Sequence, residues 1–290
     1  MSASLNQGPS RAKMLAVGAV CIALAFVLNQ ITLFRMPMGG SVTPFSMMFI
    51  VLAGYWLGPL FGVFAGAALG LLDTITGAYI VHPVQYVLDY ILGFGALGLS
   101  GFFRKWKYGL QIGYIVGVAG RFLMVFLSGV IFFYMFAPEG QPVIVYSAVY
   151  NGAYILPEMI ATLVIISLPA MKHAVDAVTK SIVSPADYAA MTAAGKGSAA
   201  IAARILTGTV SAIGGGIAFI LANYLQRMEN LTIIQLTTDA VPFLDTPRAD
   251  RLYRLVERTT EQVFALQTVG VIFVAIGIAL LFSTLARKEE

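Results

Sequence analysis

Apolar stretches of about bilayer length recur along this 290-residue chain, and they constrain its fold more than any other feature. Hydrophobic residues make up 59% of the chain and charged residues 11%, with a mean hydropathy of +0.84. A helix needs roughly 20 mainly apolar residues to cross a bilayer. Inside the bilayer each span must satisfy its own backbone hydrogen bonds, which favours helices. The sequence therefore predicts an all-α polytopic membrane protein.

Eight spans are predicted, in two groups. The first six lie near 13–34, 45–57, 59–77, 85–103, 111–136 and 144–171, and the last two near 205–224 and 264–285. Pro59, preceded by Gly58, predicts a tight reversal between the second and third spans. We expect a six-span core over 1–172, a polar cytoplasmic linker over 173–204, and an accessory transmembrane hairpin over 205–290 with a charged external loop at 226–263.

Positive charges set the expected orientation. With eight spans, one side of the membrane receives Arg11, Lys13, Arg104, Lys105, Lys107, Lys172, Lys180, Lys196, Arg204, Arg287 and Lys288, which include every lysine of the chain. Cytoplasmic loops carry an excess of such residues. Both termini are therefore predicted in the cytoplasm, and residues 78–90 at the outer surface.

Small residues recur at helical spacing in two of the spans. Gly62, Gly66 and Gly70 follow one another every fourth residue, a spacing that lets helix backbones approach closely, and we expect internal packing there. The first span has a similar face, which fits either internal packing or docking of another membrane subunit, and it comprises Ala12, Ala16, Ala19 and Ala23. Cys21, the single cysteine, is expected to be a small buried apolar residue.

Three ionisable residues fall inside predicted spans, where charge is costly. Arg121 and Glu158 lie at similar depths in the fifth and sixth spans, so we expect them to form an ion pair. Asp73 lies near the outer end of the third span, where it could cap a helix or line a vestibule. Both roles fit the sequence.

Polar and aromatic residues gather at the outer ends of two spans. If the fourth span is a regular α-helix, Gln85, Asp89 and Leu92 share one of its faces, and Tyr86 and Tyr90 the neighbouring one. In the sixth span, tyrosines recur at 146, 150 and 154, with Asn151 among them. Single tyrosines at this depth often form an interfacial belt. A carboxylate among several aromatic rings instead suits a flat organic cation.

Motifs for catalysis are missing from the chain. The sequence contains neither HExxH nor GxSxG, and "AAGKGS" near Lys196 lacks the first glycine and the Ser or Thr of a phosphate-binding loop. With only His82 and His173, a histidine metal site is not expected. We therefore expect no enzyme activity, no metal or other cofactor, and no nucleic-acid partner.

Three segments together resemble a known family. They are "AYIVHPVQYVLDYILGFGALGLSGFFRK", "RFLMVFLSGVIFFYMFAPEG" and "VYSAVYNGAYILPE", and they are similar to the thiamin-specific S-components (ThiT type) of energy-coupling factor (ECF) vitamin transporters. The likeness covers about 12–172. It implies a six-helix bundle that binds the vitamin near its outer face and works with a transmembrane coupling subunit and two ATPase subunits. The predicted C-terminal hairpin has no counterpart in that family.

The resemblance also implies roles for particular residues. The positions that match the family's pocket are Tyr79, Asp89, Tyr90, Gly129, Tyr146 and Asn151, and Phe133 occupies the place of a stacking tryptophan. Val125 stands where the family can carry a pocket histidine. Ala19 and Ala23 match its A-x-x-x-A motif for docking the coupling subunit.

The expected function is therefore capture of thiamin, or a related small cation, by a membrane subunit of an ATP-driven uptake transporter. Two other interpretations remain open. One is a stand-alone secondary carrier for another small vitamin, and the other is a membrane sensor that uses the 226–263 loop.

Overall fold

The computed structural model describes residues 10–36, 39–137, 141–193, 272, 275 and 276. Helix α1 (Arg11–Gln30) is followed by a short antiparallel hairpin, β1 (Phe34–Arg35) and β2 (Ser41–Val42). The remaining helices are α2 (Ser46–Leu57), α3 (Pro59–Ile75), a continuous helical segment from Pro83 to Phe103, α6 (Gly109–Phe132), the single turn η4 (Tyr134–Phe136), α7 (Val143–Ser167), α8 (Pro169–Ile182) and α9 (Pro185–Ala193).

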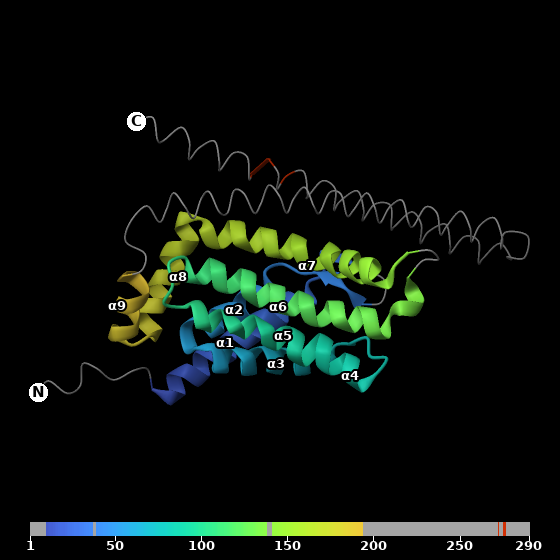
Figure 1. The fold of residues 1–290 in the computed structure, drawn as a ribbon. Coiled ribbons are helices and arrows are strands. Elements are labelled where there is room, and N and C mark those ends of the chain that lie inside the picture. Colours follow the sequence, from blue (N-terminus) through green and yellow to red (C-terminus); the bar gives the residue numbers. More distant parts are fainter. Residues whose placement is uncertain (1–9, 37–38, 138–140, 194–271, 273–274, 277–290) are drawn as a thin grey trace, which may run out of the picture.

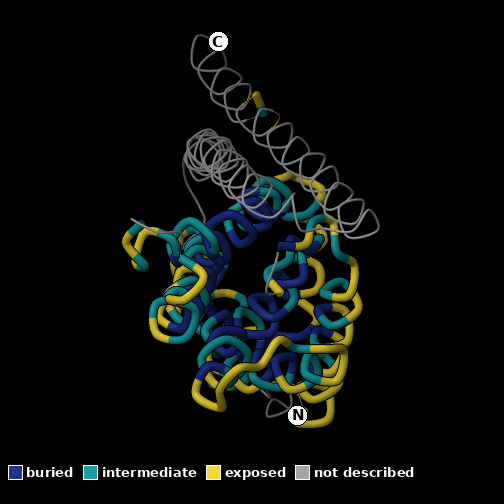
Figure 2. The backbone as a smooth tube through the Cα atoms, turned by 90° about the vertical axis from the view of Figure 1, so that its right-hand side faces the viewer, coloured by how far each residue is buried: buried dark blue, intermediate teal, exposed yellow. Residues whose placement is uncertain are grey.

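The apolar helices lie side by side along a common long axis (Figure 1). Four are long and apolar enough to cross a membrane, namely α1, the segment 83–103, α6 and α7. Helices α2 and α3 are apolar but shorter, at 12 and 17 residues. Buried residues line the inside of the bundle and exposed ones its outside (Figure 2). The predicted spans at 205–224 and 264–285 fall outside the described residues, apart from isolated helical positions at 272, 275 and 276.

The two ends of the bundle differ, and we name them by what they carry. The loop end holds the β1–β2 hairpin, the connection around 76–82 and residues 133–137, whereas the cap end holds α8 and α9 (Figure 1). The start of α1 lies at the cap end.

The predicted reversal at Pro59 is confirmed. Gly58 has φ +97°, a backbone conformation that favours glycine, and it separates α2 from α3. Pro59 then opens α3 at the first helical position, where its missing N–H costs no helical hydrogen bond.

The glycine stripe of α3 packs directly on the helical segment 83–103. A Cβ on Gly66 would lie 2.1 Å from the carbonyl oxygen of Phe94, and one on Gly70 would lie 2.2 Å from that of Tyr90. Because such distances are impossible for real carbon atoms, only glycine allows these backbones to meet. Internal packing of the stripe, as predicted, is confirmed.

Helix α1 turns two different sides to its surroundings. Cys21 and Ala25 are buried against the bundle, as expected for the cysteine. The alanine face points the other way, since Ala12, Ala16, Ala19 and Ala23 are all exposed. Within the described residues, this face is therefore not used for internal packing.

The segment 83–103 is a helix of changing pitch. It begins as α4 (Pro83–Tyr86), widens into the π-helical turn η2 (Val87–Leu92), continues as α5 (Gly93–Ala96) and tightens into the 3₁₀ helix η3 (Leu97–Phe103). The prediction that Leu92 shares a face with Gln85 and Asp89 is wrong. Gln85 is buried, whereas Leu92 is 47% exposed, because the wider turn shifts the residues after it around the helix axis.

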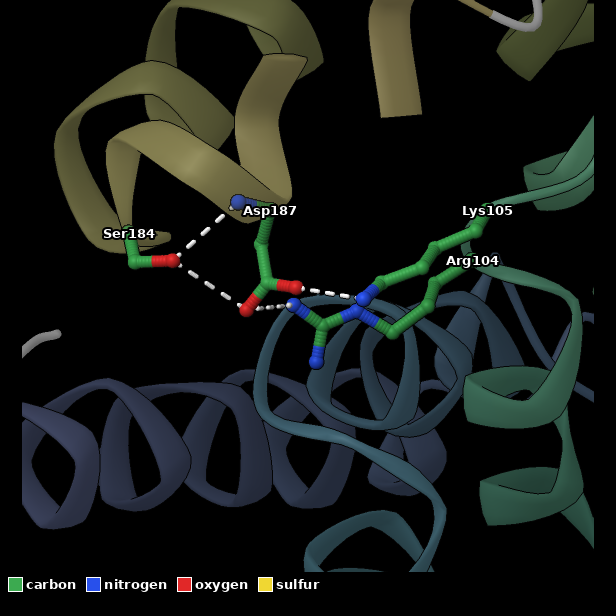
Figure 3. A network of polar contacts seen from close by, with 4 residues as sticks. All are labelled: Arg104, Lys105, Ser184 and Asp187. Carbon is green, nitrogen blue, oxygen red and sulfur yellow. Dashed lines mark hydrogen bonds and ion pairs between the residues drawn. The ribbon is translucent and has the colours of Figure 1, made fainter. Parts of the chain in front are cut away.

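Helices α8 and α9 occupy residues that the sequence analysis assigned mainly to a polar linker. They are fastened to the bundle by polar contacts. The indole Nε1 of Trp56 donates to Thr179 Oγ1 at 2.9 Å, and Lys13 Nζ donates to the Ser181 carbonyl. Asp187 lies 2.7 Å from Lys105 Nζ and 3.3 Å from Arg104 Nη2 (Figure 3).

The positive charges around Asp187 stabilise the ionised form of its carboxyl group. The hydrogen bond from Lys105 and the positive charges of Lys105 and Arg104 together lower the pKa of this carboxyl below its usual value. Ser184 adds a local cap, because its hydroxyl oxygen accepts the backbone N–H of Asp187 at 3.2 Å (Figure 3). Polar contacts near water thus contribute to holding the cap end, beside the buried residues Ile182, Val183 and Met191.

Candidate functional site

A cavity opens among the helices toward the loop end. Its walls come from the β1–β2 hairpin, α2, α3, the segment 79–94, α6 and α7. All seven predicted binding residues line it, namely Tyr79, Asp89, Tyr90, Gly129, Phe133, Tyr146 and Asn151. The structure therefore brings together residues that are up to 72 positions apart in the chain, from 79 to 151.

Gln85 fixes the carboxylate of Asp89. Its Nε2 donates to Asp89 Oδ2 at 2.6 Å and to the Tyr79 carbonyl at 3.1 Å, while its Oε1 accepts the Val81 N–H at 3.1 Å. The Gln85 side chain is 1% exposed, so these bonds are shielded from water. The hydroxyl of Ser128 lies near Asp89, but neither it nor Asp89 Oδ1 completes a hydrogen bond. Asp89 Oδ1 is therefore a buried acceptor beside the Ser128 hydroxyl, without a completed hydrogen bond.

Several aromatic rings line the same cavity as that carboxylate. The Oη of Tyr90 accepts the backbone N–H of Tyr79 at 3.0 Å, which ties the 76–82 connection to the helix that follows. The ring of Tyr79 lies 6.0 Å from that of Phe133, tilted by 33°. Tyr146 faces Tyr150 with ring centroids 6.1 Å apart. The cavity therefore offers flat apolar surface beside one fixed negative charge.

Asn151 is already engaged by its neighbours. Its Oδ1 accepts the hydroxyl of Tyr154 at 2.9 Å, and its Nδ2 donates to the Ser147 carbonyl at 2.9 Å and the Val125 carbonyl at 3.3 Å. The side chain is only 4% exposed. Asn151 in this structure therefore organises the wall between α6 and α7. That wall is tight, because a Cβ on Gly129 would lie 2.2 Å from Ser147 Oγ.

More acidic than basic side chains line the cavity. Three are carboxylates, Asp73, Asp89 and Glu158, and one is the guanidinium of Arg121. Asp73 accepts a hydrogen bond from Asn29 Nδ2 at 2.6 Å. The guanidinium carbon of Arg121 lies 3.7 Å from the ring centroid of Phe94, and its Nε and Nη1 have no hydrogen-bond partner. Ionised, this set carries a net negative charge.

The predicted ion pair between Arg121 and Glu158 is wrong. Glu158 accepts hydrogen bonds from Thr43, Ser46 and Met47 instead, and none of the ion pairs formed by the described residues joins it to Arg121. Equal depth in two helices does not fix the direction in which each side chain points. Arg121 packs against the ring of Phe94, and Glu158 accepts hydrogen bonds at the start of α2.

Sequence reasoning missed one wall of the cavity. Gly39, Gly40, Ser41 and Thr43 all line it, and Asn29 of α1 does so as well. The pair of glycines predicts a turn, and Gly39 indeed has φ +100°. Nothing in the local sequence indicates that this turn folds back onto a helix more than 100 residues later.

The arrangement suits binding of a cation more than catalysis. Within the described ranges, no group of three His, Cys, Asp or Glu side chains is placed to hold a metal ion. A carboxylate that lines a cavity together with aromatic rings attracts a flat positive group through charge and through the ring faces.

Comparison of the chain with known proteins identifies its family. The model of the thiamine transporter protein family (Thia_YuaJ) matches residues 15–177, more than half of the chain. The chain belongs to the thiamine transporter family. It is 32% identical over 184 residues to the thiamine transporter ThiT of Bacillus subtilis, covering 57% of this chain and 93% of that protein.

Two further matches carry the same name. The thiamine transporter ThiT of Lacticaseibacillus paracasei is 31% identical over 121 residues, which cover 36% of this chain and 60% of the relative. A solved structure of ThiT from Listeria monocytogenes is 26% identical, with a TM-score of 0.47, and covers 61% of this chain and 98% of that one. The thiamine transporter match ends at residue 177, within α8, so the last turn of α8 and all of α9 lie beyond it.

Proposed function

We propose that this protein is the thiamin-binding membrane subunit of an uptake transporter. The observation that carries the proposal is the cavity, which the carboxylate of Asp89 lines together with the rings of Tyr79, Tyr90 and Phe133. Membership of the thiamine transporter family supports it. The same family membership is why we propose binding and transport rather than enzyme activity.

Thiamin fits the chemistry of this cavity. It combines a permanently charged thiazolium with a flat aminopyrimidine, so it needs a carboxylate, aromatic faces and polar partners. In our proposal Asp89 attracts the positive charge, and Tyr79, Tyr90, Phe133 and Tyr146 provide the faces. Gly129 and Asn151 shape the wall between α6 and α7, with Val125 adding an apolar contact beside them.

The decisive experiment is calorimetry on the purified full chain. We expect thiamin to bind with a stoichiometry of one, and an uncharged vitamin of similar size to give no heat of binding. Preference for the uncharged compound would overturn the proposal, because the carboxylate would then have no role. Intrinsic fluorescence is a poor substitute, since Trp56 and Trp106 lie at the opposite end of the bundle from the cavity.

We further propose that transport requires an ECF coupling subunit and two ATPase subunits, docked on α1. The exposed alanine face supports this, because small residues at that spacing permit close helix approach. Ala19→Trp or Ala23→Trp should abolish uptake in cells and leave thiamin affinity intact. Leu24→Trp is the matched control, since Leu24 is exposed on α1 but points about 100° away from Ala23. Loss of binding in the alanine variants would contradict the docking role.

The domain division and orientation remain part of the same proposal. Residues 1–172 would form the six-span binding core, 205–290 an accessory hairpin, and both termini would be cytoplasmic. Deleting 205–290 should leave thiamin uptake unchanged, whereas a sensor that depends on the 226–263 loop would lose its response. Uptake by the protein alone in liposomes would instead show a self-sufficient carrier.

A further inference from the structure

We propose that Glu158 is a positioning residue that fastens one wall of the ligand cavity to α7. This wall consists of residues 39–47, which run from the β1–β2 turn into the first turn of α2. The inference rests on the proposed function, since its readout is the binding of thiamin. It concerns a carboxylate that the ligand chemistry above does not use.

The hydrogen bonds of Glu158 all lead to this wall. One oxygen, Oε2, accepts the Thr43 hydroxyl at 2.7 Å. The other, Oε1, accepts the Met47 backbone N–H at 2.9 Å and the Ser46 hydroxyl at 3.1 Å. Glu158 is 5% exposed, and Thr43 and Ser46 are also buried, so water does not compete for these bonds. A buried carboxylate with three donors is well satisfied without a cation.

Helix α2 lacks a cap of its own at this point. Phe45, which precedes it, has φ +59° and contributes no side-chain hydrogen bond to the helix. The first N–H groups of a helix have no partner within it, and they carry partial positive charge. Glu158 supplies the missing acceptor from α7, so the carboxylate caps a helix that is 111 residues away in the chain. Its negative charge makes that cap stronger than a neutral one.

Two tyrosines on the same side of α7 hold the other part of the wall. Tyr150, Tyr154 and Glu158 follow each other every fourth residue, so they form one stripe along the helix. The Tyr150 Oη accepts the Gly40 N–H at 3.1 Å, and a Cβ on Gly40 would lie 2.8 Å from the Tyr154 ring. The wall is therefore held at the β1–β2 turn by Tyr150 and Tyr154, and at the start of α2 by Glu158.

The consequence for the ligand follows from which residues line the cavity. Gly40, Thr43 and Met47 do so, and each is held by the α7 stripe. Without the charge of Glu158, residues 43–47 lose their strongest hydrogen bonds to α7. This part of the wall should then move away from α7 more often and open the cavity. Bound thiamin should then leave faster.

The test must separate positioning from direct contact, because Glu158 itself also lines the cavity. Ser46 makes this possible, since it bonds to Glu158 but does not line the cavity. Glu158→Gln should raise the dissociation rate of radiolabelled thiamin about tenfold, and Ser46→Ala about fivefold, as expected for charged and single hydrogen bonds. The two effects should add less than independently, because both changes break the Ser46–Glu158 contact, and the double variant should dissociate well under about fiftyfold faster than the parent. The remaining part belongs to the Ser46–Thr43 hydrogen bond at 2.8 Å.

A matched control and a second readout complete the experiment. Thr162 lies one turn further along α7, is buried, and bonds to none of residues 39–47, so Thr162→Val should leave the rate unchanged. In the ligand-free protein, hydrogen exchange at the Met47 amide should speed up in Glu158→Gln, while exchange at the Gly62 amide in α3 stays constant.

The outcomes are distinguishable. Faster dissociation in Glu158→Gln, with Ser46→Ala and Met47 exchange both unchanged, would mean that Glu158 touches the ligand directly and would overturn the inference. Failure of the parent protein to bind thiamin would refute the proposed function instead. Exchange at Met47 would still decide whether Glu158 fastens the wall.

Discussion

The two ends of the bundle satisfy their carboxylates in different ways. At the loop end, Asp73, Asp89 and Glu158 accept hydrogen bonds from neutral donors, and none of them forms an ion pair within the described residues. At the cap end, Asp187 is paired with both Lys105 and Arg104 and is partly exposed to water.

This difference shows what each end can do with its charge. Neutral donors stabilise a carboxylate without cancelling its charge, so the loop end can still attract a cation. A paired carboxylate near water has no such attraction to offer, and it contributes modestly to stability. The loop end is therefore suited to binding a ligand and the cap end to fastening helices together.

The largest effect is expected from removing the charge of Asp89. Asp89→Asn keeps the shape of the side chain, so we expect thiamin binding to weaken by about 1.5–3 kcal/mol, the range for a hydrogen bond to a charged group. Calorimetry measures it directly. Asp187→Asn is the matched control at the cap end, and its affinity should equal that of the parent. Equal thiamin affinities of the parent, Asp89→Asn and Asp187→Asn would show that Asp89 does not contribute to binding.

A smaller effect is expected at the cap end, on stability alone. Thr179→Val removes the acceptor for the Trp56 indole and should lower the free energy of unfolding by about 1 kcal/mol. Thermal unfolding in detergent measures this change. Thiamin affinity should be unaffected, and a fall in affinity would show that the two ends are not independent.

A gain of affinity is expected from a better ring at the loop end. Phe133→Trp should strengthen thiamin binding by about 0.5–1 kcal/mol, because tryptophan is the better partner for a cation. Phe136→Trp provides the comparison, since Phe136 contacts the ring of Phe133 but does not line the cavity. An equal gain in both variants would mean that bulk, and not contact with the cation, strengthens binding.

The smallest effect is expected from the ion pairs of Asp187. Asp187→Asn should lower the unfolding free energy by about 0.2–1 kcal/mol at neutral pH. Because folding lowers the pKa of this carboxyl, its contribution is complete above the usual aspartate pKa and is lost as the pH falls through the folded value. The melting temperatures of parent and variant should therefore converge in acid, and also in high salt. A difference that persists in acid would assign the effect to packing.

Much of the bundle could be predicted because span length and the small-residue faces are local properties of the sequence. The reversal at Pro59 and the glycine stripe of α3 both followed from spacing alone. Helices α8 and α9 were not predicted as helices, because their residues are polar and rich in small side chains. Few positions of this part of the chain are buried, namely Thr179, Ile182, Val183 and Met191.

The candidate site was harder to predict where it depends on the direction of a side chain, or on contacts between residues far apart in the sequence. Asp89 and Tyr90 were found because they belong to one compact motif. Leu92 was misplaced because a π-helical turn leaves no clear signature in residue periodicity. The partners of Glu158 lie more than 100 residues away, and depth in the membrane could not choose between them and Arg121.

The close approach of α3 to the segment 83–103 limits how this protein can change over generations. Gly66 and Gly70 touch the backbone of Phe94 and Tyr90, and both of these residues line the cavity, so replacing either glycine would displace the cavity wall. A map of mutational tolerance should therefore show two intolerant lines, one facing the ligand and one hidden behind it. A descendant that acquires a new substrate is free to vary the side chains of 79–90, but has to inherit these glycines unchanged.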